Sequence, residues 1–226
     1  MRTRIILISV IGILAFTSIH AQKMPDIKLG LKVAPNLSFL IPDTRDYKYD
    51  GVRMGGVIGL VSDFYFAEHY AFSTGFDFSM LGGKLIYPDK MKTDTGMVNS
   101  SLSFIYLEIP LMIKMVTKKF GPCTIFGQIG FGTGFRLTAH SKTSFTGENG
   151  SVVNQTSNIT AQTTNIRESV IIGIGTEIHL DESTRLFAGL TYSNSLNNVL
   201  TGYNSLSGAN IRGFLNYAEL NLGILF

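Results

Sequence analysis

The sequence predicts an all-β protein, an eight-stranded antiparallel transmembrane β-barrel with short periplasmic turns and long extracellular loops. Three observations lead to this fold class. Apolar and polar residues alternate with a period of two in successive segments, the connections between these segments alternate between short and long, and the chain opens with a stretch typical of an export signal.

The first 21 residues are typical of a secretory signal peptide. Arg2 and Arg4 form a basic start, residues 5–16 form an apolar run, and Ala21 is a small residue at the expected cleavage point. The apolar run is too short to span a bilayer as a helix, which takes about 20 residues. We therefore expect a signal peptide at 1–21 and one outer-membrane β-barrel domain at 22–226.

The mature chain is almost neutral. Of the 19 basic and 16 acidic residues, two basic residues lie in the signal, which leaves 17 against 16 and a net charge of +1. Nucleic-acid binders carry a concentrated basic face, so no nucleic-acid partner is expected. Cys123 is the only cysteine, which excludes an intramolecular disulfide framework.

Eight segments have the alternation and composition of strands. They are residues 27–39, 52–66, 70–83, 103–116, 122–140, 167–180, 185–194 and 212–226. The connections after the second, fourth and sixth segments are short (AEH, TKKFG and DEST), whereas the others are long and polar, the longest being 141–166. Outer-membrane barrels combine short periplasmic turns with long outer loops and an even number of strands. Both ends of the mature chain are therefore expected in the periplasm.

The second and third segments carry aromatic residues on both sides of the AEH turn. An aromatic girdle at the periplasmic membrane interface would produce this pattern. Ordinary aromatic packing in a sheet is the alternative. The aromatic residues are Phe64, Tyr65, Phe66, Tyr70 and Phe72.

The fourth segment, YLEIPLMIKMV, combines an apolar run with Glu108, Pro110 and Lys114. Because side chains alternate along a strand, all three lie on one face, and the aliphatic residues lie on the other. We refer to each such alternating set as a phase. A charge on the lipid side costs about 2–4 kcal/mol for Arg or Lys at mid-membrane, so the aliphatic phase should meet lipid and the charges should face the lumen. A proline removes a hydrogen-bond donor from the sheet, which predicts a bulge or a missing hydrogen bond at Pro110.

The last four segments follow the same rule. Glycines in the fifth segment, within GQIGFGTG, suit the narrow inside of a small barrel, and their order does not match a phosphate-binding loop. In the sixth and eighth segments, aliphatic residues alternate with polar residues that include Glu177 and Glu219.

The charged residues on the inner phase predict a structural network. Unpaired charges in the lumen would be costly, so we expect Glu108, Glu177 and Glu219 to pair with cationic side chains. An eight-stranded barrel is about wide enough to be filled by its own side chains. The predicted lumen network consists of Lys32, Glu108, Lys114, Arg136, Glu177 and Glu219.

Two other interpretations remain open. A soluble antiparallel sandwich also alternates polar and apolar positions. A barrel enzyme would place catalytic groups near the outer rim, where His140 and Ser141 are expected. No acid, base and nucleophile are brought together by the sequence, and the histidines lack metal-ligand spacing. No catalytic residue, cofactor site or metal site is therefore predicted, and no enzyme activity is expected.

Several stretches together resemble the PorT-like outer-membrane barrel family of Bacteroidota. They are LGLKVAPNLSFL, GLVSDFYFAEHYAFSTGFDFSMLGGKL, YLEIPLMIK and the terminal AELNLGILF. The resemblance implies an eight-stranded barrel in the cell outer membrane, surrounded by its lipid. The family's namesake is required for the type IX secretion system, which exports proteases and adhesins across the outer membrane.

The expected function is therefore that of a noncatalytic accessory to type IX protein secretion, with components of that system as partners. The alternative is a stand-alone structural or surface-interaction barrel with ligand-binding outer loops. The terminal strand, which ends at Phe226, looks like the signal by which the barrel assembly machinery recognises outer-membrane proteins.

Overall fold

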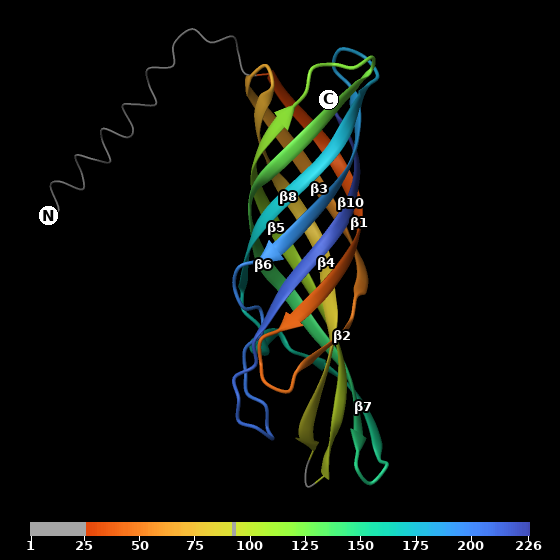
Figure 1. The fold of residues 1–226 in the computed structure, drawn as a ribbon, viewed down its shortest axis with the longest axis vertical. Coiled ribbons are helices and arrows are strands. Elements are labelled where there is room, and N and C mark those ends of the chain that lie inside the picture. The colour runs from red at the N-terminus through yellow and green to blue at the C-terminus, as the bar shows by residue number, and fades with distance from the viewer. Residues whose placement is uncertain (1–25, 92–93) are drawn as a thin grey trace, which may run out of the picture.

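Eight long antiparallel strands close into a barrel in the computed structural model, which describes residues 26–91 and 94–226 (Figure 1). Around the ring the order is β4-β3-β1-β10-β9-β8-β6-β5, and pairing of β5 with β4 completes the circle. The predicted barrel is confirmed, and the sandwich is wrong because the ring leaves no open sheet edges. The ring strands are β1 (Asp26–Pro42), β3 (Arg53–Ala67), β4 (Tyr70–Met91), β5 (Asp94–Val116), β6 (Cys123–Gly147), β8 (Ile166–His179), β9 (Arg185–Ser195) and β10 (Gly213–Leu225).

The two ends of the barrel differ in their connections. Short connections follow β3, β5 and β8 at the end that also holds Asp26 and Phe226, which we name the turn end (Figure 1). At the opposite loop end, β2 (Lys48–Gly51) pairs with β4, and β7 (Val152–Asn158) pairs with β6. A single 3-10 turn, η2 (Thr160–Gln162), follows β7.

The predicted signal peptide at 1–21 lies outside the described residues. Within the described part of the chain, no helix is long and apolar enough to cross a membrane.

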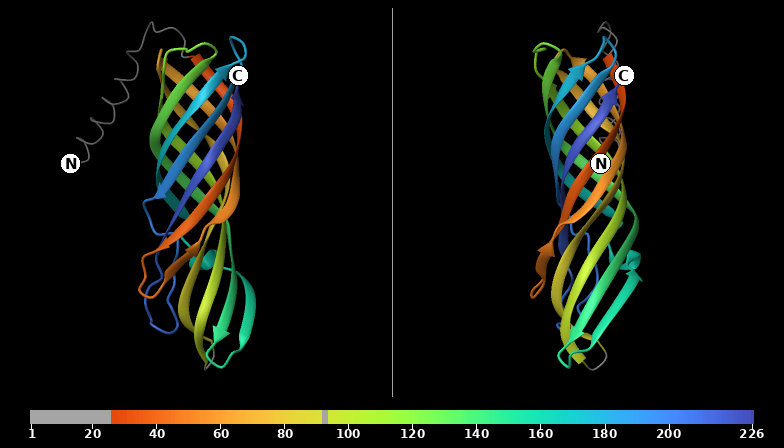
Figure 2. Two further views of the ribbon diagram at one scale, coloured as in Figure 1. Left: turned by 45° about the vertical axis from the view of Figure 1, so that its right-hand side comes forward. Right: turned by 90° about the vertical axis from the view of Figure 1, so that its right-hand side faces the viewer.

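Three strands extend further at the loop end than the sequence predicted. β4 continues to Met91 instead of 83, β5 begins at Asp94 instead of 103, and β6 continues to Gly147 instead of 140. The stretch 141–166, predicted as one long loop, contains β7. The extended parts of β4, β5 and β6, together with β2 and β7, form a curved sheet that projects beyond the barrel (Figure 2). We name this the projecting sheet.

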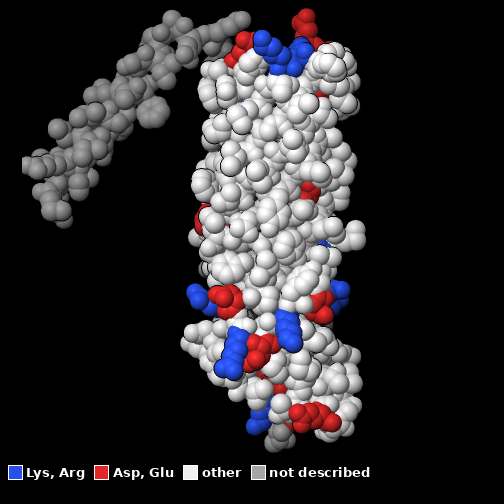
Figure 3. Space-filling view, in the orientation of Figure 1, with Lys and Arg blue, Asp and Glu red and all other residues white. Residues whose placement is uncertain are grey.

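The outer face of the barrel is apolar. On β5, Leu111, Ile113 and Met115 are 48%, 43% and 48% exposed, whereas Met112 and Lys114 between them are buried. The apolar phase runs over the eleven residues from Ile105 to Met115, which matches the roughly 9–11 residues that a tilted strand needs to cross a bilayer. On the face shown in Figure 3, charged residues gather at the turn end and over the part of the molecule toward the loop end, and the surface between them is almost free of charge.

We name the apolar outer surface of the barrel the apolar belt. Where the strands leave it, their apolar residues change from the outer to the inner face. On β4 the unbroken series of outward apolar residues ends at Met80, and the next residue, Leu81, points inward and is 2% exposed. On β5 the same change occurs between Ile105 and Phe104, which is fully buried. Met80 pairs with Ile105, and Leu81 pairs with Phe104, so both strands change phase at the same height. The outer surroundings therefore change from lipid to water at this level.

Aromatic residues line the outer face at the turn end. Phe64, Phe66, Tyr70 and Phe72 are all exposed, and the rings of Phe66 and Tyr70 stack with centroids 6.3 Å apart. Tyr65 differs from the predicted girdle, because its hydroxyl lies inside the barrel and accepts a hydrogen bond from Arg185. The alternation of strand side chains separates it from its neighbours.

Apolar side chains fill the lumen at the loop end. The connection 196–212 contributes Val199 and Leu200, and the connection after β1 contributes Tyr47. They pack against residues of the ring strands, including the fully buried Phe104 and Leu40. This cluster, which we name the apolar plug, closes the interior on the loop side. Its members are Leu40, Tyr47, Leu81, Leu85, Leu102, Phe104, Tyr106, Ala139, Val199, Leu200, Leu215 and Tyr217.

Pro110 interrupts the sheet without causing a bulge. On the β4 side the register runs from Thr74 opposite Leu111 to Asp77 opposite Glu108 without a shift, and no pairing joins the residues between them. Thr74 Oγ1 donates a hydrogen bond to the Pro110 carbonyl instead, at 2.8 Å. The bulge lies closer to the loop end, where Ile105 and Tyr106 of β5 face β6. The prediction of a bulge or a missing hydrogen bond at Pro110 is confirmed in its second form, a break in the pairing without a bulge.

Candidate functional site

Charged side chains occupy the lumen between the turn end and the apolar plug. The first cluster, near the turn end, centres on Lys114 of β5. Its Nζ lies 2.6 Å from Asp63 Oδ2 and 2.6 Å from Glu177 Oε1. Glu177 also binds Arg185, whose Nη1 lies 3.0 Å from Oε2. All of these carboxylates and Lys114 are almost completely buried, so the charges compensate one another away from solvent.

A second cluster lies around Lys32 of β1. Lys32 Nζ is 2.7 Å from Asp77 Oδ2 and 3.5 Å from Glu219 Oε1. Gly59 lies beside this pair, and a Cβ at that position would collide with the Asp77 carboxylate and crowd Lys32 Cε. Glycine is required there because the ion pair occupies the space of a side chain.

The third cluster, next to the apolar plug, joins Glu108 of β5 to Arg167 of β8. Arg167 Nη1 lies 2.8 Å from Glu108 Oε1, and Ser79 and Tyr217 donate to Oε2 at 2.7 and 2.9 Å. Arg167 is fully buried and gives its remaining hydrogen bonds to β9 and β10, to Ser193 Oγ and the Leu215 carbonyl. One guanidinium thus connects three sides of the lumen.

Arg136 corrects the predicted network. It does not contact Glu108, because Arg167 occupies that carboxylate. Arg136 instead donates to the Thr160 carbonyl and to Asn165 Oδ1, in the segment between β7 and β8. The ladder between β6 and β8 ends at the preceding residue, with Phe135 opposite Ile166. On its β8 side Arg136 therefore faces this connection, whereas on its β5 side it pairs with Tyr106.

The other five residues of the predicted network lie in the three clusters: Lys32 and Glu219 in the second, Lys114 and Glu177 in the first, and Glu108 in the third. Sequence reasoning missed four members of the clusters: Asp63, Asp77, Arg167 and Arg185. All of them lie on the inner face of their strands, so the alternation rule assigns them to the lumen just as it does the predicted residues.

The lumen leaves little room for a ligand. A cavity of about 40 Å³ lies between the first and second clusters, lined by Lys32, Lys114 and Gln128 among others. This volume holds about three water molecules at most. In the described part of the chain, no group of three or more His, Cys, Asp or Glu side chains could hold a metal ion. Paired charges therefore occupy most of the described interior between the turn end and the apolar plug.

His140 and Ser141 lie on opposite faces of β6. The His140 ring is exposed on the outside, with Nδ1 3.1 Å from Thr138 Oγ1. Ser141 is buried on the inside, and its Oγ lies 3.0 Å from that of Ser100. Because the two side chains point away from each other, they form no catalytic pair.

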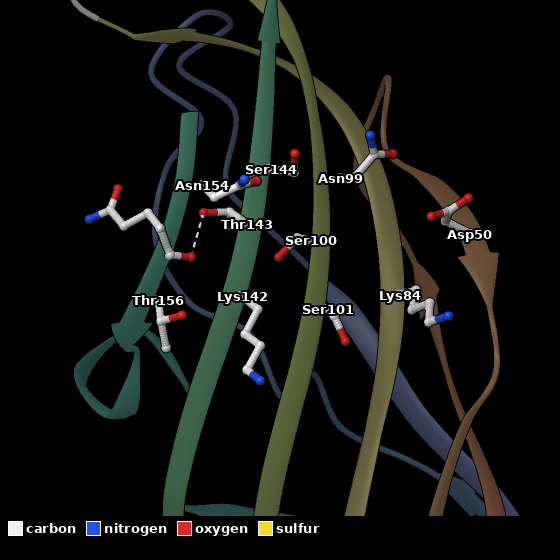
Figure 4. Close-up of a pocket in the computed structure, with 11 residues that line it drawn as sticks. Asp50, Lys84, Asn99, Ser100, Ser101, Lys142, Thr143, Ser144, Asn154 and Thr156 are labelled. Atoms are coloured by element: carbon white, nitrogen blue, oxygen red, sulfur yellow. Dashed lines mark hydrogen bonds between the residues drawn. The ribbon is translucent and has the colours of Figure 1, made fainter. Parts of the chain in front are cut away.

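A polar groove lies on the projecting sheet. It has a volume of about 380 Å³, and hydroxyl, amide and charged side chains from five strands line it (Figure 4). The lining residues are Asp50, Lys84, Asn99, Ser100, Ser101, Lys142, Thr143, Ser144, Asn154, Gln155 and Thr156.

Residues 20–201 match the family described as outer membrane protein beta-barrel domain. Among solved structures, the chain is similar to Neisserial surface protein A, with 10% identity, a TM-score of 0.48 and coverage of 88% of this chain and 95% of that one. It is also similar to OprG from Pseudomonas aeruginosa, with 10% identity, a TM-score of 0.48 and coverage of 91% and 98%. Ail, the attachment invasion locus protein of Yersinia pestis, shares 12% identity with a TM-score of 0.35 and coverage of 86% and 97%. No curated protein matches significantly.

Proposed function

The chain belongs to the outer membrane protein beta-barrel domain family, and from this premise we propose that it is a noncatalytic accessory of type IX protein secretion. It acts through the two ends of its barrel. In the outer membrane the turn end faces the periplasm and the loop end faces outward, as in other barrels of this kind.

The filled lumen is the observation that supports this proposal most. Three charge clusters and the apolar plug occupy the interior from one end to the other, which argues against transport of a substrate through the barrel. A protein of this kind is left with its outer surface and its two ends for contacts with other molecules. The projecting sheet is one such surface.

The secretion role itself rests on the resemblance of four stretches to the PorT-like family. These stretches fall on β1, on the hairpin of β3 and β4, on β5 and on β10. They form the barrel wall and not the projecting tips, so the resemblance points to the class of machinery and not to a contact residue. Components of the type IX system are the proposed partners. We also propose that the barrel assembly machinery recognises the strand that ends at Phe226.

The absence of catalysis is part of the proposal. His140 and Ser141 point to opposite sides of β6, and the buried carboxylates in the lumen pair with Lys or Arg. A reacting group would need a nucleophile or base that a substrate can reach. The lumen offers no space for one.

A second candidate function is that of a stand-alone surface-interaction barrel. The specific observation in its favour is the projecting sheet, whose groove of about 380 Å³ lies beyond the apolar belt on the outer side. Hydroxyl and amide groups such as those of Asn99, Ser144 and Asn154 suit a polar ligand from the surroundings of the cell.

Deletion of the gene followed by a comparison of secreted proteins tests the first proposal. Loss of type IX cargo from the medium, restored by the wild-type gene, is the expected result. Normal export of that cargo would rule out the secretion role.

A groove variant separates the two candidates. N99A/S144A/N154A removes three polar side chains that line the groove and leaves the barrel wall unchanged. Heat-modifiable gel mobility verifies the fold. Loss of surface binding in this variant, together with normal export of type IX cargo in the deletion strain, would favour the second candidate.

A further inference from the structure

A row of polar and cationic side chains crosses the outer face of the projecting sheet. Lys84 of β4 lies opposite Ser101 of β5, which lies opposite Lys142 of β6, which in turn lies opposite Thr156 of β7. Figure 4 shows these four side chains in one row, with those of Asn99, Ser144 and Asn154 in the next. Two intervening strand spacings place the backbones of Lys84 and Lys142 about 10 Å apart.

The row lies just beyond the apolar belt, on its loop-end side. The unbroken series of outward apolar residues ends at the pair Met80 and Ile105, and Lys84 follows Met80 by four residues on the same face. Four residues cover about 14 Å of strand, or about 10 Å of height at a tilt of about 45°. The headgroup region is about 5–8 Å thick on each side of a bilayer, and lysine side chains extend toward such interfaces. The ammonium groups can therefore reach the headgroups of the outer leaflet.

The row is cationic and has free hydrogen-bond donors. Lys84 and Lys142 are exposed, and neither forms an ion pair with any described residue. Arg53 reaches the same row across Gly82, where any Cβ would collide with Arg53 Cδ, and its Nη1 donates to Ser101 Oγ at 3.1 Å. Among the described residues that line the groove, Asp50 is the one carboxylate and Lys84 and Lys142 are the two cations, with Arg53 next to them.

We propose that Lys84 and Lys142, with Arg53 beside them, bind a phosphate group on the headgroup of a glycolipid in the outer leaflet. Phosphate attracts several cationic donors at once, and the neighbouring hydroxyl and amide groups of Ser101, Thr156 and Asn99 match the hydroxyl groups of a sugar. A lipid ligand fits this position better than a soluble one, because the row lies only about 10 Å beyond the end of the lipid-facing surface at Met80.

Binding of lipid A by the purified, folded mature protein in neutral detergent micelles tests this proposal. The probes are bisphosphorylated lipid A, the same lipid after dephosphorylation, and inorganic phosphate, followed by native mass spectrometry. A lysine near an anionic bilayer surface strengthens binding by about fivefold, so K84Q/K142Q should bind the phosphorylated lipid about 25-fold more weakly. The control is K118Q/K119Q, which removes two exposed lysines from the connection after β5 at the turn end.

The proposal predicts that the wild type and the control prefer phosphorylated lipid A, that K84Q/K142Q loses this preference, and that inorganic phosphate at equal concentration does not displace the lipid. Equal binding of both lipids, an equal loss in the control variant, or full displacement by inorganic phosphate would each overturn it. Heat-modifiable mobility of every variant verifies that a lost preference does not come from misfolding.

Discussion

Arg167 and Glu108 form an ion pair inside the closed barrel, with Nη1 2.8 Å from Oε1 and side-chain exposures of 0% and 6%. The two residues come from β8 and β5, which are separated in the ring by β6. The pair therefore links two strands that share no backbone hydrogen bonds. The pair also contacts the apolar plug, because Tyr217 of the plug donates a hydrogen bond to Glu108 Oε2.

Replacing Arg167 with Met should destabilise the barrel strongly. The change leaves Glu108 buried without its cation, a loss that typically costs about 3–5 kcal/mol. Guanidinium unfolding followed by circular dichroism measures the effect. The double variant R167M/E108Q removes the unpaired charge and should recover part of the loss. An unfolding midpoint of R167M equal to that of the wild type would show that the pair contributes nothing.

The barrel and its inner phase could be predicted because lipid and a filled lumen force a period of two on every strand. On β5 the eleven residues from Ile105 to Met115 follow this rule without exception. The projecting sheet escaped prediction because the rule reverses there. Where water replaces lipid around the strand, the apolar residues Phe104 and Leu102 point inward. The sequence pattern of the membrane-spanning part therefore stops there, although the strand continues. The paired change at Met80 and Ile105 is the sequence signal that marks the exit from the membrane.

The network could be predicted only in part for a related reason. Phase assigns a side chain to the lumen but does not determine which partner it meets across the barrel. Lys32 and Glu219 lie on neighbouring strands, β1 and β10, whereas Glu108 meets Arg167 two strands away. Such contacts inside the lumen depend on the length of each side chain and on the position of its residue along the barrel axis. The sequence pattern determines neither.

Gly59 should not tolerate alanine. A Cβ there would collide with the Asp77 carboxylate, which is held by Lys32, so either the ion pair or the backbone of β3 must shift. Overpacking of this kind costs about 1–3 kcal/mol. Gly127 is the matched control, because a Cβ at that position meets nothing within 4 Å. The denaturant midpoint should fall for G59A and stay near that of the wild type for G127A, and equal midpoints for both variants would contradict the packing argument.

Asp181 should make the turn between β8 and β9 sensitive to acid. Backbone hydrogen bonds from Thr184 and Ser183, at 2.7 and 2.8 Å, hold the pKa of the Asp181 carboxyl below its ordinary value. A lowered pKa in the fold means that the stabilisation is present above the ordinary value of about 4 and is lost as the pH falls through the lowered one. Hydrogen exchange at the two amides should therefore lose protection below about pH 4.

The variant D181A provides the control for this pH dependence. It removes the titrating group, so protection of the Ser183 and Thr184 amides should be low at every pH and should not fall further in acid. Acid-dependent protection that persists in D181A would assign the effect to another group.

Arg136 should anchor the segment that connects β7 to β8. Its guanidinium donates to the Thr160 carbonyl and to Asn165 Oδ1, and its amide donates to the Asn165 carbonyl at 2.8 Å. R136Q keeps the amide contact and loses the two contacts of the guanidinium, so residues 159–165 should open more often while the barrel below them stays intact. Brief proteinase K treatment of whole cells, followed by mass spectrometry, should show several times faster cleavage within 159–165. R45Q is the matched control, because the Arg45 side chain is 92% exposed at the same end of the molecule. Equal cleavage in R136Q and R45Q would mean that other contacts of this segment, and not Arg136, hold it against the barrel.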